Sequence, residues 1–211
     1  MDLHTLLLRG SSENLFDQFL VECQKFYEQP AHTFTEMRTR ANKKIRGDLF
    51  EEFCVLYLKY VRGYEEAWRL EDVPDEVLGG LGLQRQDMGI DIVCMSKGKY
   101  TAVQCKYKKH TSIKKNIVTW KQLSTFYALV LRTGPWEKYI VMTNCEYVRH
   151  MGKKTPKDLS ICLRTFRKIT KEQWTRMCEL KGEKTVDEPV KKLTPEELRA
   201  VRLARFTQGA V

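Results

Sequence analysis

Two segments rich in β-forming residues, joined by a short turn, constrain the fold of this chain more than any other feature of its sequence. Residues 90–95 (Ile-Asp-Ile-Val-Cys-Met) and 100–107 (Tyr-Thr-Ala-Val-Gln-Cys-Lys-Tyr) flank the segment Ser96-Lys-Gly-Lys99. Such a pair of segments around a glycine-containing turn is typical of a β-hairpin. If Lys97 and Gly98 are the two central turn residues, Asp91 lies directly opposite Gln104. The sequence therefore predicts an antiparallel hairpin in this register.

The same register predicts where three polar side chains lie. The Cβ atoms of opposed residues are about 5 Å apart, so Asp91 and Gln104 would be in contact. Side chains alternate along a strand, so Lys106 lies on the face of Gln104, while Val103 and Cys105 point the other way. Burying three polar groups together costs several kcal/mol unless they bond to one another or to a ligand. We therefore expect Asp91, Gln104 and Lys106 to form a polar site.

Charged residues are unevenly distributed along the chain. Lys and Arg number 37 against 27 Asp and Glu, a formal net charge of +10, which makes a polyanion the first candidate partner. Acidic residues are dense before Asp91 and absent from there to Glu137. The cations in that acid-free stretch are Lys97, Lys99, Lys106, Lys108, Lys109, Lys114, Lys115, Lys121 and Arg132. An acidic segment followed by a basic one is typical of a metal-dependent phosphodiester site, and two solvated faces are the alternative.

The remaining patterns predict helices on both sides of the hairpin. We expect helices at about 13–28, capped by Ser12, and at about 48–61, then a surface connection over 63–88. A helix over 116–131 and a buried strand over 138–143 would follow, with two more helices near 158–168 and 171–180. The expected fold class is α/β (or α+β): a mixed central sheet of about four or five strands flanked by helices, with extra helices at both ends.

The chain is expected to divide into three parts. Residues 1–45 form an amino-terminal helical extension, residues 46–180 the main domain, and residues 181–211 a linker and helical tail that leads towards a further domain. Seven scattered cysteines without a CxxC pair indicate reduced thiols, and hence a reducing intracellular compartment such as cytoplasm or nucleus. No apolar run approaches the roughly 20 residues of a membrane-spanning helix, so no membrane partner is expected.

Glu51 is a candidate fourth member of the polar site. It lies in Gly47-Asp-Leu-Phe-Glu51, near the predicted start of its helix. Asp48 followed three residues later by Glu51 has the spacing of a helix capping box, and this structural interpretation stands beside a role in the site. The adjacent Glu52 is expected to face solvent.

Three motifs in series resemble those of a known family. They are Gly47-x-x-Phe50-Glu51, Asp87-x-Gly89-Ile90-Asp91-Ile92-Val93 and Val103-Gln104-Cys105-Lys106. Together they resemble the PD-(D/E)XK nuclease superfamily, in particular the Mrr-like restriction endonucleases, in which Gln replaces the usual acid. The resemblance covers residues 45–145. The proline of the family motif has no counterpart, since Gly89-Ile90 precedes Asp91, and Gln104 removes one negative charge, which leaves the number of metal ions open.

The resemblance implies a restriction-endonuclease-like fold and a Mg²⁺-dependent (or Mn²⁺-dependent) endonuclease that hydrolyses phosphodiester bonds of DNA. The catalytic residues would be Glu51, Asp91, Gln104 and Lys106. Oxygen ligands of the metal would come from Asp91, Gln104, the main-chain carbonyl of Cys105, and Glu51 directly or through water. Lys106 would orient the attacking water and stabilise developing negative charge. Gln122 matches a position that is often Gln in this branch, so a contact with the site and a solvated helix position both stay open.

Binding of nucleic acid is expected to involve the lysines that follow the catalytic strand. Lys108, Lys109, Lys114 and Lys115 would contact phosphates and place a backbone at the metal. RNA remains an alternative substrate, and a catalytically inactive binding module or a partner-docking domain are alternative functions. A homodimer is a further expectation, as is fusion to a helicase or translocase, because Mrr-like domains often form the front of larger proteins of that type.

Overall fold

The computed structural model of this 211-residue chain describes residues 14–28, 43–86, 89–109, 116–150 and 155–182. The chain divides into two compact units, Met1–Glu179 and Leu180–Val211, and the architecture below is that of the first. Within the described ranges no helix is long and apolar enough to cross a bilayer.

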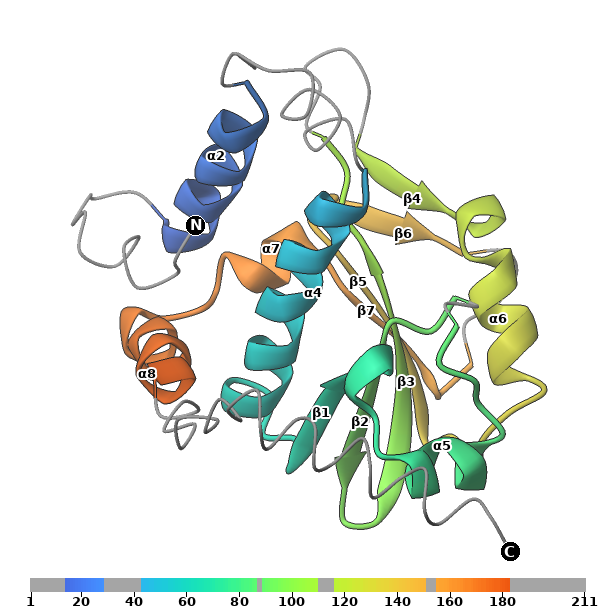
Figure 1. Cartoon of the computed structure of the whole chain (residues 1–211). Helices are drawn as coiled ribbons and strands as arrows, with labels where there is room; N and C mark the ends of the chain where they lie inside the picture. Colours follow the sequence, from blue (N-terminus) through green and yellow to red (C-terminus); the bar gives the residue numbers. More distant parts are fainter. Residues whose placement is uncertain (1–13, 29–42, 87–88, 110–115, 151–154, 183–211) are drawn as a thin grey trace, which may run out of the picture. The chain divides into compact units, whose positions relative to one another are not determined.

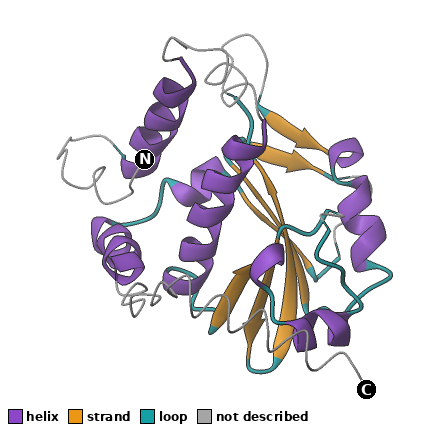
Figure 2. Cartoon of the chain, in the orientation of Figure 1, coloured by secondary structure: helices purple, strands orange, loops and turns teal. Residues whose placement is uncertain are grey.

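A five-stranded mixed sheet forms the centre of the first unit (Figures 1 and 2). Its strands, in spatial order, are β1 (Glu66–Arg69), β2 (Ile92–Ser96), β3 (Lys99–Lys106), β5 (Lys138–Thr143) and β7 (Asp158–Ile161). The β1–β2 and β2–β3 pairs are antiparallel, whereas β3, β5 and β7 run parallel. A smaller parallel sheet pairs β4 (Ile117–Thr119) with β6 (Tyr147–Arg149). The predicted mixed α/β fold is confirmed.

The β2–β3 hairpin has the predicted register. Ile92 pairs with Val103 and Ser96 with Lys99, so Lys97 and Gly98 are the two turn residues. Their φ angles of 52° and 69° are both positive, as a turn that follows the right-handed twist of the strands requires. A glycine reaches this conformation without strain, and a lysine there is uncommon.

Helices cover both faces of the sheet. Their bounds are α2 (Leu15–Glu28), α4 (Lys43–Tyr60), α5 (Asp75–Leu81), α6 (Ser124–Val130), α7 (Leu163–Phe166) and α8 (Lys171–Gly182), with short 3₁₀ helices η1 (Leu70–Asp72) and η2 (Trp120–Gln122). Figure 1 shows α4 on one side of the sheet and α6 on the other. The strand residues alternate accordingly: Val103 belongs to the hydrophobic cluster under α4, and Ala102 to the cluster under α6.

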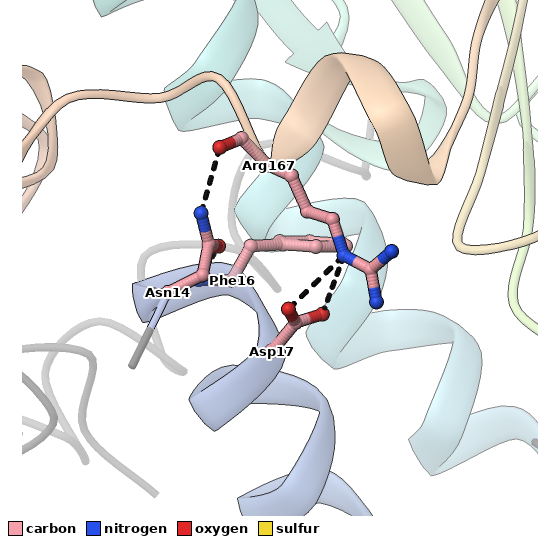
Figure 3. Close-up of polar contacts among 4 residues, drawn as sticks. All are labelled: Asn14, Phe16, Asp17 and Arg167. Carbon is pink, nitrogen blue, oxygen red and sulfur yellow. Dashed lines mark hydrogen bonds and ion pairs between the residues drawn. The ribbon is translucent and has the colours of Figure 1, made fainter. Parts of the chain in front are cut away.

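The helix α2, the first helix within the described residues, shares the core under α4. Phe16 is almost fully buried, and the centroid of its ring lies 4.7 Å from the ring centroid of Phe166 in α7. Polar contacts fix the same docking, as Figure 3 shows. The side chain of Asn14 donates to the carbonyl of Arg167 at 2.7 Å, and Arg167 Nε donates to Asp17 Oδ1 at 2.9 Å. Residues 14–28 therefore pack as part of the first unit.

The prediction that 63–88 is a surface connection was wrong. This segment contains β1, η1 and α5, and it buries Leu70, Val73 and Leu78 against the α6 side of the sheet. The elements are too short for a periodic pattern to emerge, and their apolar residues are separated by acidic ones.

Two predicted helices contain strands. Residues 116–131 begin with β4 and η2 before the shorter helix α6, and residues 158–161 form the edge strand β7 ahead of α7. Both short strands are stabilised by neighbours distant in sequence, as in the pairing of Ser160 with Val141. Local propensity cannot predict such pairing, because strand preference depends on the partner strand.

Candidate active site

Asp91 lies immediately before the first residue of β2, where its backbone bonds to the neighbours on both sides. Its N–H donates to the carbonyl of Val103 at 2.9 Å, and its carbonyl accepts from the N–H of Leu70 at 2.8 Å. The residue is therefore fixed between β3 and the segment that follows β1. This anchoring sets the direction of its half-buried side chain.

The Asp91 carboxylate is held by two donors from β3. Oδ2 accepts hydrogen bonds from the side-chain amide of Gln104 and from the backbone N–H of Cys105, the latter at 2.5 Å. Gln104 is only 2% exposed, so its amide is satisfied inside the protein. The predicted contact between Asp91 and Gln104 is present.

Gly89, in the motif that precedes Asp91, permits the approach of α6. Its φ is +107°, and a Cβ added there would lie 3.0 Å from the backbone nitrogen of Phe126. A side chain at position 89 would therefore be strained in its backbone and would press on the helix. The glycine lets α6 pack directly on the loop that carries Asp91.

Lys106 ends β3, two residues beyond Gln104 and on the same face of the strand. It is half-buried, and its backbone pairs with Thr143 in β5. The fully buried hydroxyl of Thr143 donates to the carbonyl of Lys106 at 2.6 Å. The end of the strand is thus held by its neighbour while the lysine side chain extends from the Gln104 face.

Asn144 continues this support along the segment after β3. Its side-chain oxygen accepts from the N–H of Lys108 at 2.8 Å, and its amide donates to the carbonyl of the same residue at 2.7 Å. Asn144 is 5% exposed, so a buried side chain replaces a paired strand at this point. Sequence analysis assigned no role to Thr143 or Asn144. Buried polar residues directly after an apolar strand are the signal that could have found them.

Glu51 is not part of a helix cap. The helix α4 begins at Lys43, which places Asp48 and Glu51 in its second turn and beyond, so the capping-box interpretation is wrong. The Glu51 carboxylate lies over the preceding turn: a Cβ at Gly47 would be 3.4 Å from its Oε1. A side chain at position 47 would therefore make ordinary van der Waals contact with this carboxylate. Glu52, expected to face solvent, is half-buried.

Two buried thiols lie near both carboxylates. Cys54 of α4 and Cys105 of β3 hydrogen-bond to one another, and burial raises the pKa of each thiol above its ordinary value. The negative charges of Glu51 and Asp91 add to both increases in pKa. Carboxylates from the helix and the hairpin thus act on the same pair of thiols. These thiols remain protonated at neutral pH and are weak nucleophiles.

Among the candidate residues after Lys106, Lys108 and Gln122 make contact with each other. The ammonium of Lys108 donates to the carbonyl of Ile117 at 2.6 Å and to Gln122 Oε1 at 2.9 Å. Gln122 lies in η2, where it also accepts from the N–H of Thr119 at 3.1 Å. Lys109 is exposed. Lys114, Lys115 and Asp87 lie outside the described residues.

Few of the described side chains near Asp91 could act as metal ligands. Among the described residues no group of three or more His, Cys, Asp or Glu side chains is arranged to hold a metal ion. The oxygen-bearing groups here are instead one carboxylate, one side-chain amide and one peptide group, from Asp91, Gln104 and Cys105. Lys106 lies two residues beyond Gln104 in the same strand.

A mixed sheet whose antiparallel hairpin presents Asp, Gln and Lys at the strand ends defines a restriction-endonuclease-like fold. Residues 58–174, more than half of the chain, match the model of a family described as restriction endonuclease, of the Mrr catalytic type. The chain belongs to this restriction endonuclease family and is an Mrr-like member of the PD-(D/E)XK superfamily. The matched segment includes Asp91, Gln104 and Lys106 and begins after Glu51. Neither a curated protein nor a solved structure matched the chain.

Proposed function

We propose that this protein is a divalent-cation-dependent endonuclease that hydrolyses phosphodiester bonds of DNA, with Mg²⁺ or Mn²⁺ as the cation. The observation that carries the proposal is the joining of Asp91, Gln104 and the Cys105 peptide at one point of the sheet. The family match supports nuclease chemistry, and the roles of individual residues below are our assignments.

The atoms around Asp91 suit a hard cation. A residue in a strand directs its N–H and C=O to the same side, and the N–H of Cys105 is directed at Asp91. Its carbonyl therefore leaves β3 on that side too, whereas the carbonyl of Lys106 is directed at Thr143 of β5. Mg²⁺ prefers oxygen ligands and keeps several waters, so a few protein oxygens suffice. Asp91, the Cys105 carbonyl, the Gln104 side-chain oxygen and Glu51 would provide them.

The neutral side chain of Gln104 is compatible with close contact to the Asp91 carboxylate. Its amide donates to the Asp91 carboxylate, whereas a glutamate at this position would place two negative charges in contact. When the amide nitrogen bonds to Asp91, the amide oxygen is directed away from that carboxylate, and we assign to it the role of a ligand. The neutral residue therefore removes repulsion and keeps one oxygen donor.

A bound cation would offset negative charge on the scissile phosphate and lower the pKa of a coordinated water. Lys106 would hold the attacking water by a hydrogen bond and stabilise the charge that develops on the phosphate oxygens. Glu51 would orient a further water or bind the cation. For these roles, the side chains of Lys106 and Glu51 must reach a cation or water bound at the Asp91 carboxylate.

DNA would approach through the lysines after β3. Lys109 is exposed and directly follows Lys108, whose backbone is held by Asn144. Its ammonium is therefore well placed to contact a phosphate. Lys108 directs two of its three N–H donors at protein oxygens, and we propose that it shapes this segment in addition to adding positive charge. Lys114 and Lys115 would contact further phosphates of the same backbone. An RNA substrate would bind to the same lysines, and so would DNA held by a dimer of this protein.

The direct test is cleavage of supercoiled plasmid. We expect nicked and linear products with Mg²⁺ or Mn²⁺ and none with EDTA, because the Asp91 site lacks sufficient positive charge alone. Gel electrophoresis over a time course measures the rates. Binding without cleavage under any cation, together with no Mg²⁺ uptake by calorimetry, would instead support an inactive nucleic-acid-binding module.

Gln104→Glu tests the role of the neutral amide. Without a cation, the second carboxylate beside Asp91 should lower the free energy of unfolding by about 1–3 kcal/mol, since a buried acceptor then loses its donor. Addition of Mg²⁺ should recover much of this loss, because the cation binds only the folded state. Thermal unfolding with EDTA and with Mg²⁺ measures both effects. The exposed Gln84→Glu is a control for the added charge, and equal responses of the two variants would contradict our assignment.

A further inference from the structure

A cationic cavity lies at the end of the sheet opposite to Asp91. Its volume is about 370 Å³, and the β2–β3 turn, the start of β5 and the residues after α4 line it. The eight residues of β3 connect this end with Lys106, and at about 3.3 Å per residue the two ends are roughly 23 Å apart. A group bound in this cavity is therefore distinct from a phosphate at Asp91.

Four cations and one carboxylate line the cavity. The positive side chains belong to Arg62, Lys97, Lys99 and Lys138, and the negative one to Glu137. Lys99 Nζ lies 3.3 Å from Glu137 Oε2, with both side chains largely exposed. Such an exposed pair contributes little stability and exchanges readily for another anion. A second acid, Glu65, accepts the backbone N–H of Lys97 at 3.0 Å and so supports the turn.

Neutral hydrogen-bond donors complete the wall. Thr101 is 2% exposed, and its side chain hydrogen-bonds to Tyr64; both residues line the cavity, as does Ser96. Burial raises the pKa of Tyr64, so its phenol stays protonated and remains a donor at neutral pH. Ammonium, guanidinium and hydroxyl donors around a small cavity are the groups that bind phosphate oxygens.

The turn itself gives a second indication. Lys97 has a φ of +52°, where Asn or Gly would be favoured. A lysine here costs some stability and adds a charge at the cavity edge. An unfavourable residue at a turn is a reason to look for a function of its side chain.

We propose that this cavity binds a phosphate group, as a monoester or polyphosphate, at a site separate from the cleavage site. The volume of the cavity is within the range of small-ligand sites and too small for a duplex to enter. The ligand is a free polyphosphate or the phosphorylated end of a nucleic-acid strand, and both present the same oxygens to the cavity.

Calorimetry with pyrophosphate in EDTA tests the proposal, because neither cleavage nor the metal site contributes under these conditions. Lys97→Asn/Lys99→Gln/Lys138→Gln should weaken binding at least about tenfold. Asparagine suits the positive φ at position 97, so the turn is expected to be kept. The control Arg132→Gln/Lys168→Gln/Arg176→Gln removes three exposed cations outside the cavity lining and should change affinity less than about twofold.

The outcomes separate this site from the nuclease. Asp91→Asn should bind pyrophosphate like the parent, and this holds even if the plasmid is never cut. If the protein binds a 5′-phosphorylated oligonucleotide more tightly than a 5′-hydroxyl one, and the cavity variant loses this preference, the ligand is a strand end. If the cavity variant loses only pyrophosphate binding, the ligand is a free polyphosphate. No binding of pyrophosphate, equal loss in the control variant, or equally tight binding of citrate would overturn the proposal.

Discussion

Lys106→Met is expected to reduce the rate of DNA cleavage at least about 100-fold, the typical effect of removing one group that stabilises transition-state charge. Methionine keeps the apolar stem of the half-buried side chain and removes only the ammonium. The end of β3 is held by its pairing with β5 and by the Thr143 hydroxyl, so the free energy of unfolding should change by less than about 1 kcal/mol. Single-turnover cleavage and urea unfolding measure the two quantities.

Lys109→Met is the matched control for this substitution. It removes the same charge from an exposed position just beyond the strand. We expect weaker binding of DNA with a shallower salt dependence, and a parental rate once the DNA is saturating. If Lys106→Met cleaves at the parental rate with saturating DNA, Lys106 contributes only binding and our assignment is incorrect.

The sequence predicts most reliably where local and long-range requirements coincide. The hairpin register follows from the turn residues Lys97 and Gly98, whose positive φ angles are intrinsic to a two-residue turn. The strand over 138–143 was predicted with its observed bounds, because a continuous apolar run after a turn favours a strand in the middle of a sheet. In these segments the local signal agrees with the final fold.

Elements that depend on distant partners were predicted poorly. The edge strand β7 exists because β5 pairs with it, and its own sequence, Asp-Leu-Ser-Ile, has no strong preference. Asp48 resembled a cap because the pattern ahead of it contains several lysines and arginines, yet the helix continues back to Lys43. Basic residues are good helix formers, so the apolar pattern marked the packed part of the helix and missed its start.

The candidate site shows the same division. The contact of Asp91 with Gln104 followed from the register of neighbouring strands, and it is present. The support from Thr143 and Asn144 joins residues 36 or 37 positions apart through side-chain bonds to backbone. No local spacing encodes such contacts. The catalytic roles of Glu51 and Lys106 stay predictions.

Asp91→Asn is expected to abolish detectable cleavage without unfolding the protein. The asparagine oxygen can accept from Gln104 and from the N–H of Cys105, as Oδ2 of the aspartate does. Its other atom is then an N–H donor where a cation would require an oxygen. The hydrogen bonds are kept, while the charge and one ligand are lost. Plasmid cleavage and the effect of Mg²⁺ on thermal unfolding report the two consequences, and the Mg²⁺-induced rise in Tm should disappear.

Asp91→Ala separates this effect from a structural one. Without an acceptor, the buried amide of Gln104 and the Cys105 N–H lose their partner, so this variant should be less stable by about 1–3 kcal/mol. Both variants should fail to cut, but only the alanine variant should unfold at a clearly lower temperature in EDTA. DNA binding by Asp91→Asn in EDTA should equal or exceed that of the parent, since one negative charge near the phosphate is removed. Cleavage by Asp91→Asn at the parental rate would show that the cation, and hence the reaction, is located elsewhere on the protein.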